Sequence, residues 1–162
     1  MSINYLTYHS PLGLLRILAN KKGIYRLTVT EEDWQQYQQQ VGTVEEISAL
    51  DYPIVEQLDE YFRKERKSFD LPLVWEGSPF YQQVWQELQS IPYGQVKSYG
   101  ELAQAVGKPK AARAIGQANR ANPLPIIIPC HRVIGKNGKL VGYAGSRTDI
   151  KEFLLRLEGF ID

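Results

Sequence analysis

Residues 122–135 have the sequence NPLPIIIPCHRVIG and contain Cys130, the only cysteine of the 162-residue chain. The apolar run 126–128 ahead of it predicts a short buried strand, and His131 follows the cysteine directly. A lone thiol beside an imidazole is a candidate nucleophile with its base. The alternative is a structural cysteine that packs as a small apolar side chain.

The nucleophilic form of cysteine is the thiolate, so Cys130 needs a lowered pKa and a group that takes its proton. His131 is the obvious base, but successive side chains of an extended segment point to opposite faces. We therefore expect either a turn of the chain after Pro129 or a water that carries the proton to the imidazole.

Three helices are predicted upstream of this stretch. Ser78 is a natural N-cap followed by a proline and an apolar stripe. Ser98 and Glu101 are spaced as a capping box for a short second helix, and a third helix covers 111–119. Residues 98–121 therefore predict a helix, a turn that contains glycine and a second helix of small residues, which is the outline of a helix-turn-helix.

The second helix of this pair is mostly Ala and Gly around one long cation, Arg113. Helices that read the major groove usually present Asn, Gln, Arg or Ser to base edges. A smooth helix suits a narrow groove instead, where the backbone approaches closely and one side chain enters the base stack. The alternative is an alanine-rich core helix with a surface arginine, because this outline recurs in proteins that do not bind DNA.

Positive charge is gathered in one segment although the net charge is only +1. No acidic residue lies between Glu101 and Asp149, so all 18 acidic residues lie at those two positions or outside them. Such a block predicts a phosphate-binding face, with a solvated basic surface as the alternative. Its basic residues are Lys108, Lys110, Arg113, Arg120, Arg132, Lys136, Lys139 and Arg147.

The C-terminal segment predicts an amphipathic helix that begins at a capping box of Asp149 and Glu152 and ends before Gly159. Glu158 lies at the edge of its apolar stripe. A carboxylate there can face inward and hold a histidine in one tautomer, and an ordinary glutamate at a helix end is the alternative. The stripe consists of Ile150, Phe153, Leu154 and Leu157.

Residues 1–75 predict a supporting α/β lobe without a cluster of reactive groups. Apolar runs separated by turn sequences predict three antiparallel strands. Two helices follow, one carrying Trp34 and one opening at Pro53. Residues 76–162 form the second domain, with the helix-turn-helix and Cys130. The three runs are 3–8, 14–19 and 24–29.

Several protein classes are excluded by composition. No run of about 18 apolar residues exists, and the N-terminus lacks the regions of a signal peptide. We therefore expect no membrane partner and a cytoplasmic or nuclear location. One cysteine cannot form an internal disulfide, and two histidines, His9 and His131, make a zinc site unexpected.

The block 122–135 resembles the active-site block of the methylated-DNA–protein-cysteine methyltransferases, which move an alkyl group from O6 of guanine onto their own cysteine. The resemblance is clear over 78–159 and weak before it. It implies a mixed α/β (α+β) fold with an N-terminal ribonuclease H-like lobe, carrying a short antiparallel sheet, and a C-terminal helical winged-helix-like domain that binds DNA and accepts the alkyl group. It also implies a monomer that needs no cofactor or metal and whose partner is double-stranded DNA with alkylated bases.

Catalytic roles are implied by the same resemblance. Cys130 would accept the alkyl group irreversibly, once, from O6-alkylguanine and also from O4-alkylthymine. His131 would act as base through a bound water, with Glu158 as its orienter. Asn122 would support the site by hydrogen bonds, and Tyr99 would give a proton to the departing base.

Contacts with DNA and with the flipped base are implied as well. Arg113 would fill the hole left when the damaged nucleotide is flipped out, a step that is needed because the alkyl carbon is out of reach inside the duplex. Relatives vary between Gly, Ser and Ala at the positions of Ala144 and Ser146, which leaves the tolerated alkyl size open. The other implied DNA contacts are Lys110, Ala111, Ala112, Ala114, Gly116 and Arg120. The implied substrate pocket consists of Pro125, Val133, Tyr143, Ala144, Gly145 and Ser146.

Two other functions compete with this hypothesis. A regulator or a non-catalytic lesion sensor of the same fold would bind DNA without reacting. Known sensors replace the cysteine, however, and a regulator should carry base-reading side chains on its helix. A cysteine hydrolase would need turnover and an oxyanion hole, and no nucleophile elbow precedes Cys130.

Overall fold

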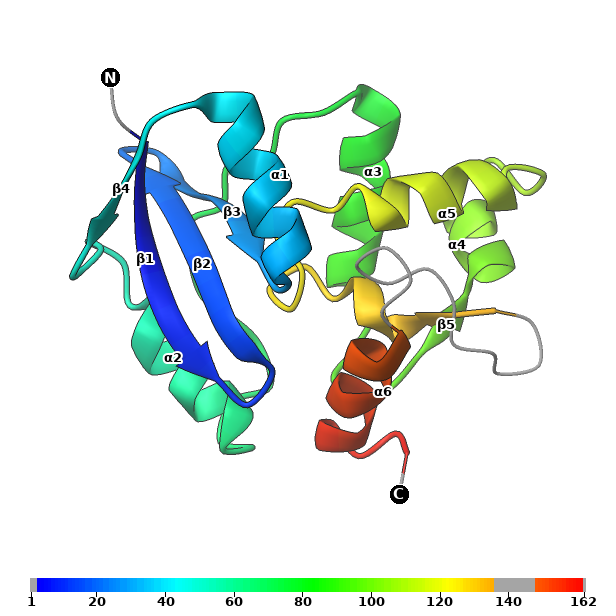
Figure 1. The fold of residues 1–162 in the computed structure, drawn as a ribbon. Coiled ribbons are helices and arrows are strands. Elements are labelled where there is room, and N and C mark those ends of the chain that lie inside the picture. The colour runs from blue at the N-terminus through cyan, green and yellow to red at the C-terminus, as the bar shows by residue number, and fades with distance from the viewer. Residues whose placement is uncertain (1–2, 136–147, 162) are drawn as a thin grey trace. The chain divides into compact units, whose positions relative to one another are not determined.

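The computed structural model describes residues 3–135 and 148–161. The chain divides into two compact units, Met1–Trp75 and Glu76–Asp162, whose elements are labelled in Figure 1. Within the described ranges, no helix has the length and apolar character needed to cross a membrane.

The N-terminal unit is built on a four-stranded sheet with the order β3-β2-β1-β4. The three predicted antiparallel strands are confirmed, and β4 adds to β1 in parallel. This fourth strand was not predicted, because its sequence VEEI lacks the apolar–polar alternation of a half-buried strand. The strands are β1 (Ile3–Ser10), β2 (Gly13–Asn20), β3 (Gly23–Thr28) and β4 (Val44–Ile47).

Helices pack on both faces of this sheet. Trp34 packs with Leu18 of β2 on one face. On the other face, the Tyr8 hydroxyl of β1 donates a hydrogen bond of 2.6 Å to Asp59. The two predicted helices are thus confirmed, and they lie on opposite faces of the sheet. The helices are α1 (Glu31–Val41), which carries Trp34, and α2 (Ile54–Phe62), which carries Asp59.

The described part of the C-terminal unit is mainly helical, with one short parallel sheet. Its elements are α3 (Pro79–Gln89), β5 (Lys97–Ser98), α4 (Tyr99–Ala105), α5 (Ala112–Arg120), the 3-10 turn η1 (Cys130–Arg132), β6 (Val133–Ile134) and α6 (Thr148–Leu157).

The predicted starts of α3 and α4 are confirmed. The Ser78 side chain accepts a hydrogen bond from the backbone of α3, and Ser98 and Glu101 form the expected capping box of α4. Trp85 of α3 donates its indole N–H to the backbone oxygen of Ala118 in α5, at 2.9 Å. The helix-turn-helix of α4 and α5 is therefore fixed to the core by a buried hydrogen bond.

The predicted strand over 126–128 is wrong, although the run is buried as expected. The chain turns there: the N–H of Ile128 donates to the oxygen of Leu124 at 2.8 Å, and Ile126 has a φ of 76°. Asn122 holds the turn, since its side chain accepts from the N–H of Leu124 and donates to the oxygen of Ile128. These bonds and the burial of the isoleucines maintain a backbone conformation that a β-branched residue rarely adopts.

The buried face of α6 also differs from the prediction. Asp149 lies inside the first turn, so the capping box with Glu152 is wrong, and Glu152 accepts a hydrogen bond from Arg156 instead. Phe153 is 37% exposed, whereas Lys151 is completely buried. The prediction placed Phe153 in the apolar stripe and left out Lys151, because a lysine is not expected in a core. The buried residues of α6 are Ile150, Lys151, Leu154 and Leu155.

Candidate active site

The short parallel pair of β5 and β6 brings two distant parts of the chain together. Lys97 pairs with Val133, and Ser98 pairs with Ile134. The start of α4, which is Tyr99, therefore lies close to the turn that begins at Cys130. The turn η1 also packs against α3 and α6, so residues from four segments surround the cysteine.

Cys130 is 4% exposed and is the first residue of η1. The chain thus turns after Pro129, which is one of the two arrangements that the sequence required. The carbonyl oxygen of Cys130 accepts a hydrogen bond from the Asn119 side chain at 3.3 Å. Asn119 lies on α5, so the turn is tied directly to the helix that carries the predicted DNA contacts.

The thiol of Cys130 is not activated in the free protein. Burial raises its pKa to about 11, against the opposing effects of a hydrogen bond with Asn122 and the charge of Lys151. This differs from the lowered pKa that the sequence argument required. A cysteine in this state is a thiol at neutral pH, so its proton has to be removed during the reaction.

His131 and Glu158 meet in the core, and both side chains are fully buried. His131 Nε2 lies 2.7 Å from Glu158 Oε2. Burial by itself raises the pKa of Glu158, but hydrogen bonds and charge from His131 and Arg132 hold it well below the usual range. Burial lowers the pKa of His131, opposed by Glu158 and reinforced by Arg132 and Lys151. An ionised carboxylate only accepts hydrogen bonds, so Nε2 of the neutral imidazole carries the proton and Nδ1 is left as the basic nitrogen.

Arg132 is buried and faces away from solvent, at 7% exposure. Its guanidinium donates to both oxygens of Glu158, from Nε at 2.8 Å and from Nη2 at 2.9 Å. Arg132 therefore does not contribute to the exposed basic surface expected from its segment. Counting charges along the sequence could not separate a buried, paired arginine from exposed ones.

Lys151 is a functional candidate that the sequence analysis missed. Its Nζ lies 5.9 Å from the centre of the Tyr99 ring. Burial lowers its pKa to about 8, while the nearby Cys130 raises it. A lysine inside the apolar stripe of the last helix was the signal that could have identified it.

Tyr99 is positioned by the first turn of α4. Burial and Cys130 raise the pKa of its hydroxyl, against the lowering effects of Arg120 and a hydrogen bond with Asn119. The group is therefore protonated at neutral pH, which is the state that a proton donor requires. Asn119 is also buried and was missed, because an Asn within a small-residue helix carries no distinctive spacing.

The predicted DNA contacts lie on the turn before α5 and on α5 itself. Lys110, Ala112, Arg113 and Arg120 are exposed, whereas Ala111, Ala114 and Gly116 are half-buried. A Cβ at Gly116 would lie 3.8 Å from the Tyr99 ring, so α5 runs close to the reactive cluster. Three basic residues of the predicted segment, Lys136, Lys139 and Arg147, lie outside the described residues.

Only part of the implied substrate pocket can be placed. Pro125 is half-buried and Val133 is buried in β6. The other four residues, Tyr143, Ala144, Gly145 and Ser146, fall outside the described ranges. Residues 3–135 and 148–161 hold no cluster of three His, Cys, Asp or Glu side chains suited to a metal ion.

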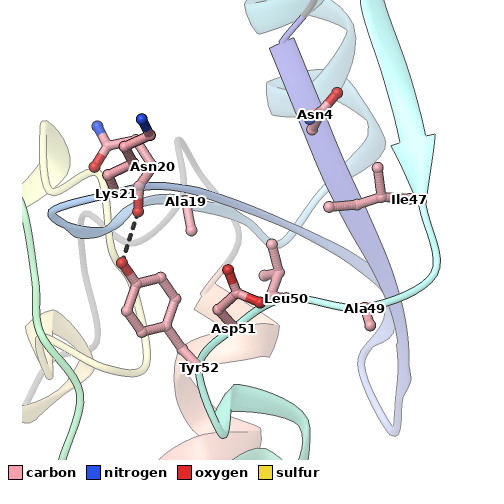
Figure 2. Close-up of a pocket in the computed structure, with 9 residues that line it drawn as sticks. All are labelled: Asn4, Ala19, Asn20, Lys21, Ile47, Ala49, Leu50, Asp51 and Tyr52. Atoms are coloured by element: carbon pink, nitrogen blue, oxygen red, sulfur yellow. Dashed lines mark hydrogen bonds between the residues drawn. The ribbon is translucent and has the colours of Figure 1, made fainter.

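A separate hollow of about 500 Å³ lies in the N-terminal unit. Figure 2 shows its lining, in which Tyr52 donates a hydrogen bond of 2.7 Å to the oxygen of Asn20. No cysteine or histidine is among its lining residues. This hollow therefore has neither the acceptor thiol nor the base of the cluster around Cys130.

Comparison with known proteins shows the family of the chain. The family described as "6-O-methylguanine DNA methyltransferase, DNA binding domain" matches residues 79–160, and its "ribonuclease-like domain" matches residues 3–74. The constitutive methylated-DNA–protein-cysteine methyltransferase of Bacillus subtilis is 52% identical over 155 residues, which cover 95% of this chain and 94% of that protein. The chain belongs to the methylated-DNA–protein-cysteine methyltransferase family.

Other relatives and solved structures agree. The methylated-DNA–protein-cysteine methyltransferase of Mycolicibacterium paratuberculosis is 44% identical, over 96% of this chain and 92% of its own. A crystal structure of Mycobacterium tuberculosis OGT in complex with DNA superposes with a TM-score of 0.86 at 41% identity, covering 96% of this chain and 92% of that one. The expected fold, a ribonuclease-like lobe followed by a helical DNA-binding domain, is confirmed.

Proposed function

We propose that this protein repairs DNA by moving the alkyl group of an O6-alkylguanine onto Sγ of Cys130. The observation that carries the proposal is the buried cluster in which Cys130 lies near Tyr99 and is followed by the His131–Glu158 pair. Membership of the family supports the same activity. A sensor without the acceptor cysteine does not fit this chain, because Cys130 occupies the centre of the cluster.

The reaction is a displacement at the alkyl carbon. The bond from Sγ to that carbon forms while the bond from the carbon to O6 breaks. The thiol proton passes to Nδ1 of His131, through a water, and the departing guanine takes a proton from the Tyr99 hydroxyl. Tyr99 then regains the proton that His131 holds, by way of solvent. The products are a thioether and an unmodified guanine.

The protein acts once in this scheme. A thioether has no good leaving group, and the chain has no second cysteine that could relieve it. Asn122 supports the site by holding the turn before Cys130. Lys151 stabilises the thiolate as it forms, since an opposite charge nearby lowers the pKa of a thiol. The same chemistry applies to O4-alkylthymine, whose alkyl group is also carried by an exocyclic oxygen.

A damaged base in double-stranded DNA reaches Cys130 only if it leaves the base stack. The alkyl carbon is inaccessible inside the duplex, and flipping a nucleotide costs a few kcal/mol. Arg113 projects from the exposed side of α5, where it enters the stack and fills the vacated space. The small residues beside it let the helix backbone approach a narrow groove. We propose that a monomer carries out the reaction, in the cytoplasm or wherever the DNA is held.

Intact-protein mass spectrometry after mixing with a duplex that contains one O6-methylguanine tests the proposal. The expected result is one methyl group per protein, located on Cys130 by peptide mapping, with repair that stops at one lesion per molecule. Methyl on another residue, or repair beyond one lesion per protein, would overturn it. An unmodified guanine duplex is the control.

A further inference from the structure

The Glu158 carboxylate forms hydrogen bonds with two side chains, His131 and Arg132. Its Oε2 lies 2.7 Å from His131 Nε2 and 2.9 Å from Arg132 Nη2, while its Oε1 lies 2.8 Å from Arg132 Nε. The N–H of Gly94 also points to Oε1, at 3.4 Å. The carboxylate is thus held on both oxygens by a guanidinium and on one of them by the imidazole.

Arg132 is fixed in place by groups other than Glu158. Its Nη1 donates to the backbone oxygen of Ile91, just beyond α3, at 2.7 Å, and its guanidinium carbon lies 5.8 Å from the centre of the Tyr93 ring. All three guanidinium nitrogens therefore donate hydrogen bonds within the protein. Because arginine does not lose its proton in proteins, this positive charge is permanent.

The permanent cation changes what Glu158 does to His131. In a catalytic triad, a buried carboxylate stabilises the imidazolium. Here the carboxylate is already neutralised by a bidentate guanidinium, so less of its charge is left to favour a protonated His131. The charged groups that act on His131 are Glu158 and Lys151 from the C-terminal segment and Arg132 from its own turn, which also holds Cys130. Tyr93, from the segment after α3, lies beside Glu158 and Arg132.

We propose that Arg132 is a positioning residue for the transfer reaction: it neutralises Glu158, so that His131 remains a neutral imidazole whose Nε2–H is directed at Glu158 and whose Nδ1 can take the proton of Cys130. A protonated His131 could not accept that proton. The inference rests on the proposed transfer to Cys130, because it concerns the base of that reaction.

The two histidines of the chain make a direct test possible. In protein labelled with 15N-histidine, His131 gives one set of ring signals, and His9, exposed on β1, gives the other and serves as an internal reference. We expect His131 in the wild type to show the neutral form with the proton on Nε2 at neutral pH. In Arg132→Gln, the uncompensated Glu158 should raise the pKa of His131 by about one unit or more.

Two further variants separate charge from structure. Arg132→Gln combined with Glu158→Gln removes both charges and should return His131 to the neutral form, because burial alone disfavours the imidazolium. Arg132→Lys keeps a cation but loses the fork that contacts both oxygens, so it should raise the pKa of His131 in the same direction by a smaller amount. A merely structural arginine would lower thermal stability in these variants without this ordered change in the titration.

The transfer rate provides the second measurement. With free O6-benzylguanine as substrate, the acid limb of the pH–rate profile of Arg132→Gln should move to higher pH in step with the His131 titration. If Arg132→Gln does not fold, Arg132→Lys decides the question: an unchanged or lowered pKa of His131 overturns the inference. Failure of the wild type to alkylate Cys130 would instead overturn the proposed function, and the NMR titration does not depend on that activity.

Discussion

The buried cluster around Cys130 and the exposed side of α5 use charge in opposite ways. In the cluster, Arg132 and Glu158 lie within 2.9 Å of each other and are removed from water. On α5, Arg113 and Arg120 are exposed. Buried charges have to be paired, because the desolvation cost of a lone ion is several kcal/mol. Exposed cations bind phosphates by releasing counterions. One unit of the chain thus contains a neutralised reaction centre and a separate surface suited to DNA.

The largest effect should come from removing the acceptor thiol, a change that alters the buried cluster and leaves the exposed side of α5 intact. We expect Cys130→Ser to lose transfer below detection, because a serine hydroxyl is a far weaker nucleophile than a thiol at neutral pH. Its affinity for DNA should be unchanged, since the cations of α5 are intact. Transfer is measured by intact mass, and affinity by fluorescence anisotropy with the same duplex. Loss of DNA binding in this variant would show that the two regions are not separable.

Arg113 and Tyr99 should differ in the substrates on which they matter. Arg113→Ala should slow repair of a duplex by about 100-fold, because the unstacking cost of a few kcal/mol is no longer offset. It should leave reaction with free O6-benzylguanine nearly unchanged. Tyr99→Phe should slow both reactions by about 100-fold or more, since a proton donor to the departing base is needed in either case.

Single-turnover rates for both variants on both substrates decide the matter. Equal damage by Arg113→Ala to duplex and free base would place this arginine in the pocket. A Tyr99→Phe variant impaired only on the duplex would assign the tyrosine to flipping.

The residue pattern predicted the helix-turn-helix, and the family resemblance implied the pairing of His131 with Glu158, but neither indicated the charges buried beside that pair. Capping residues and helical periodicity are local signals, so α3 and α4 were predicted with their starts and α5 to within one residue. Lys151 and Arg132 appeared as ordinary basic residues, since burial is set by tertiary packing and a charge count along the chain does not contain it. The strand expected over 126–128 failed for a different reason. Three isoleucines signal burial, whereas the turn depends on two local hydrogen bonds of Asn122, with Leu124 and Ile128, which apolar periodicity does not indicate.

Buried and exposed charges can also be compared by their effect on the free energy of unfolding. The C-terminal segment takes part in one buried ion pair, Glu158–Arg132, and one exposed ion pair, Glu152–Arg156. Glu158→Gln should destabilise the fold by about 3 kcal/mol, because it leaves Arg132 buried without its counterion. Glu152→Gln, the matched control, removes only an exposed pair with Arg156 (2.9 Å) and should cost about 0.5 kcal/mol or less. Urea unfolding at pH 7 measures both.

The buried Glu158–Arg132 pair predicts that the stability of the fold depends on pH. The pKa of Glu158 is lower in the folded protein than its usual value of about 4.3. The stability that its charged form contributes is therefore present above about pH 4.3 and is lost as the pH falls below that value. The wild-type advantage over Glu158→Gln should shrink over this range. A constant difference down to pH 3 would mean that Glu158 is not held ionised.

Reactivity of the free thiol should follow pH in the absence of DNA. Because burial raises the pKa of Cys130 to about 11, the thiolate is a minor form at pH 7 and increases about tenfold per pH unit. Alkylation by iodoacetamide should rise with that slope from pH 7 to 8. It should rise less steeply above pH 8, where Lys151, with a pKa of about 8, loses its charge. Lys151→Met should be slower at pH 7 and lack this bend. A flat profile would indicate a thiolate already formed in the free protein.

The smallest effect should be on DNA affinity. Lys110→Ala and Arg120→Ala each remove one exposed cation beside α5, and neither change removes a base-reading group. If each cation contacts one phosphate, the slope of log affinity against log salt should decrease by about one per variant, equally for all duplex sequences. Transfer to free O6-benzylguanine should be unaffected by Lys110→Ala, because that substrate has no phosphates. Lys22→Ala, an exposed lysine of the N-terminal unit, provides the control for a unit change in net charge. If Lys22→Ala lowers the slope as much as the two variants beside α5, the binding is a response to net charge, and the exposed side of α5 is not a defined DNA face.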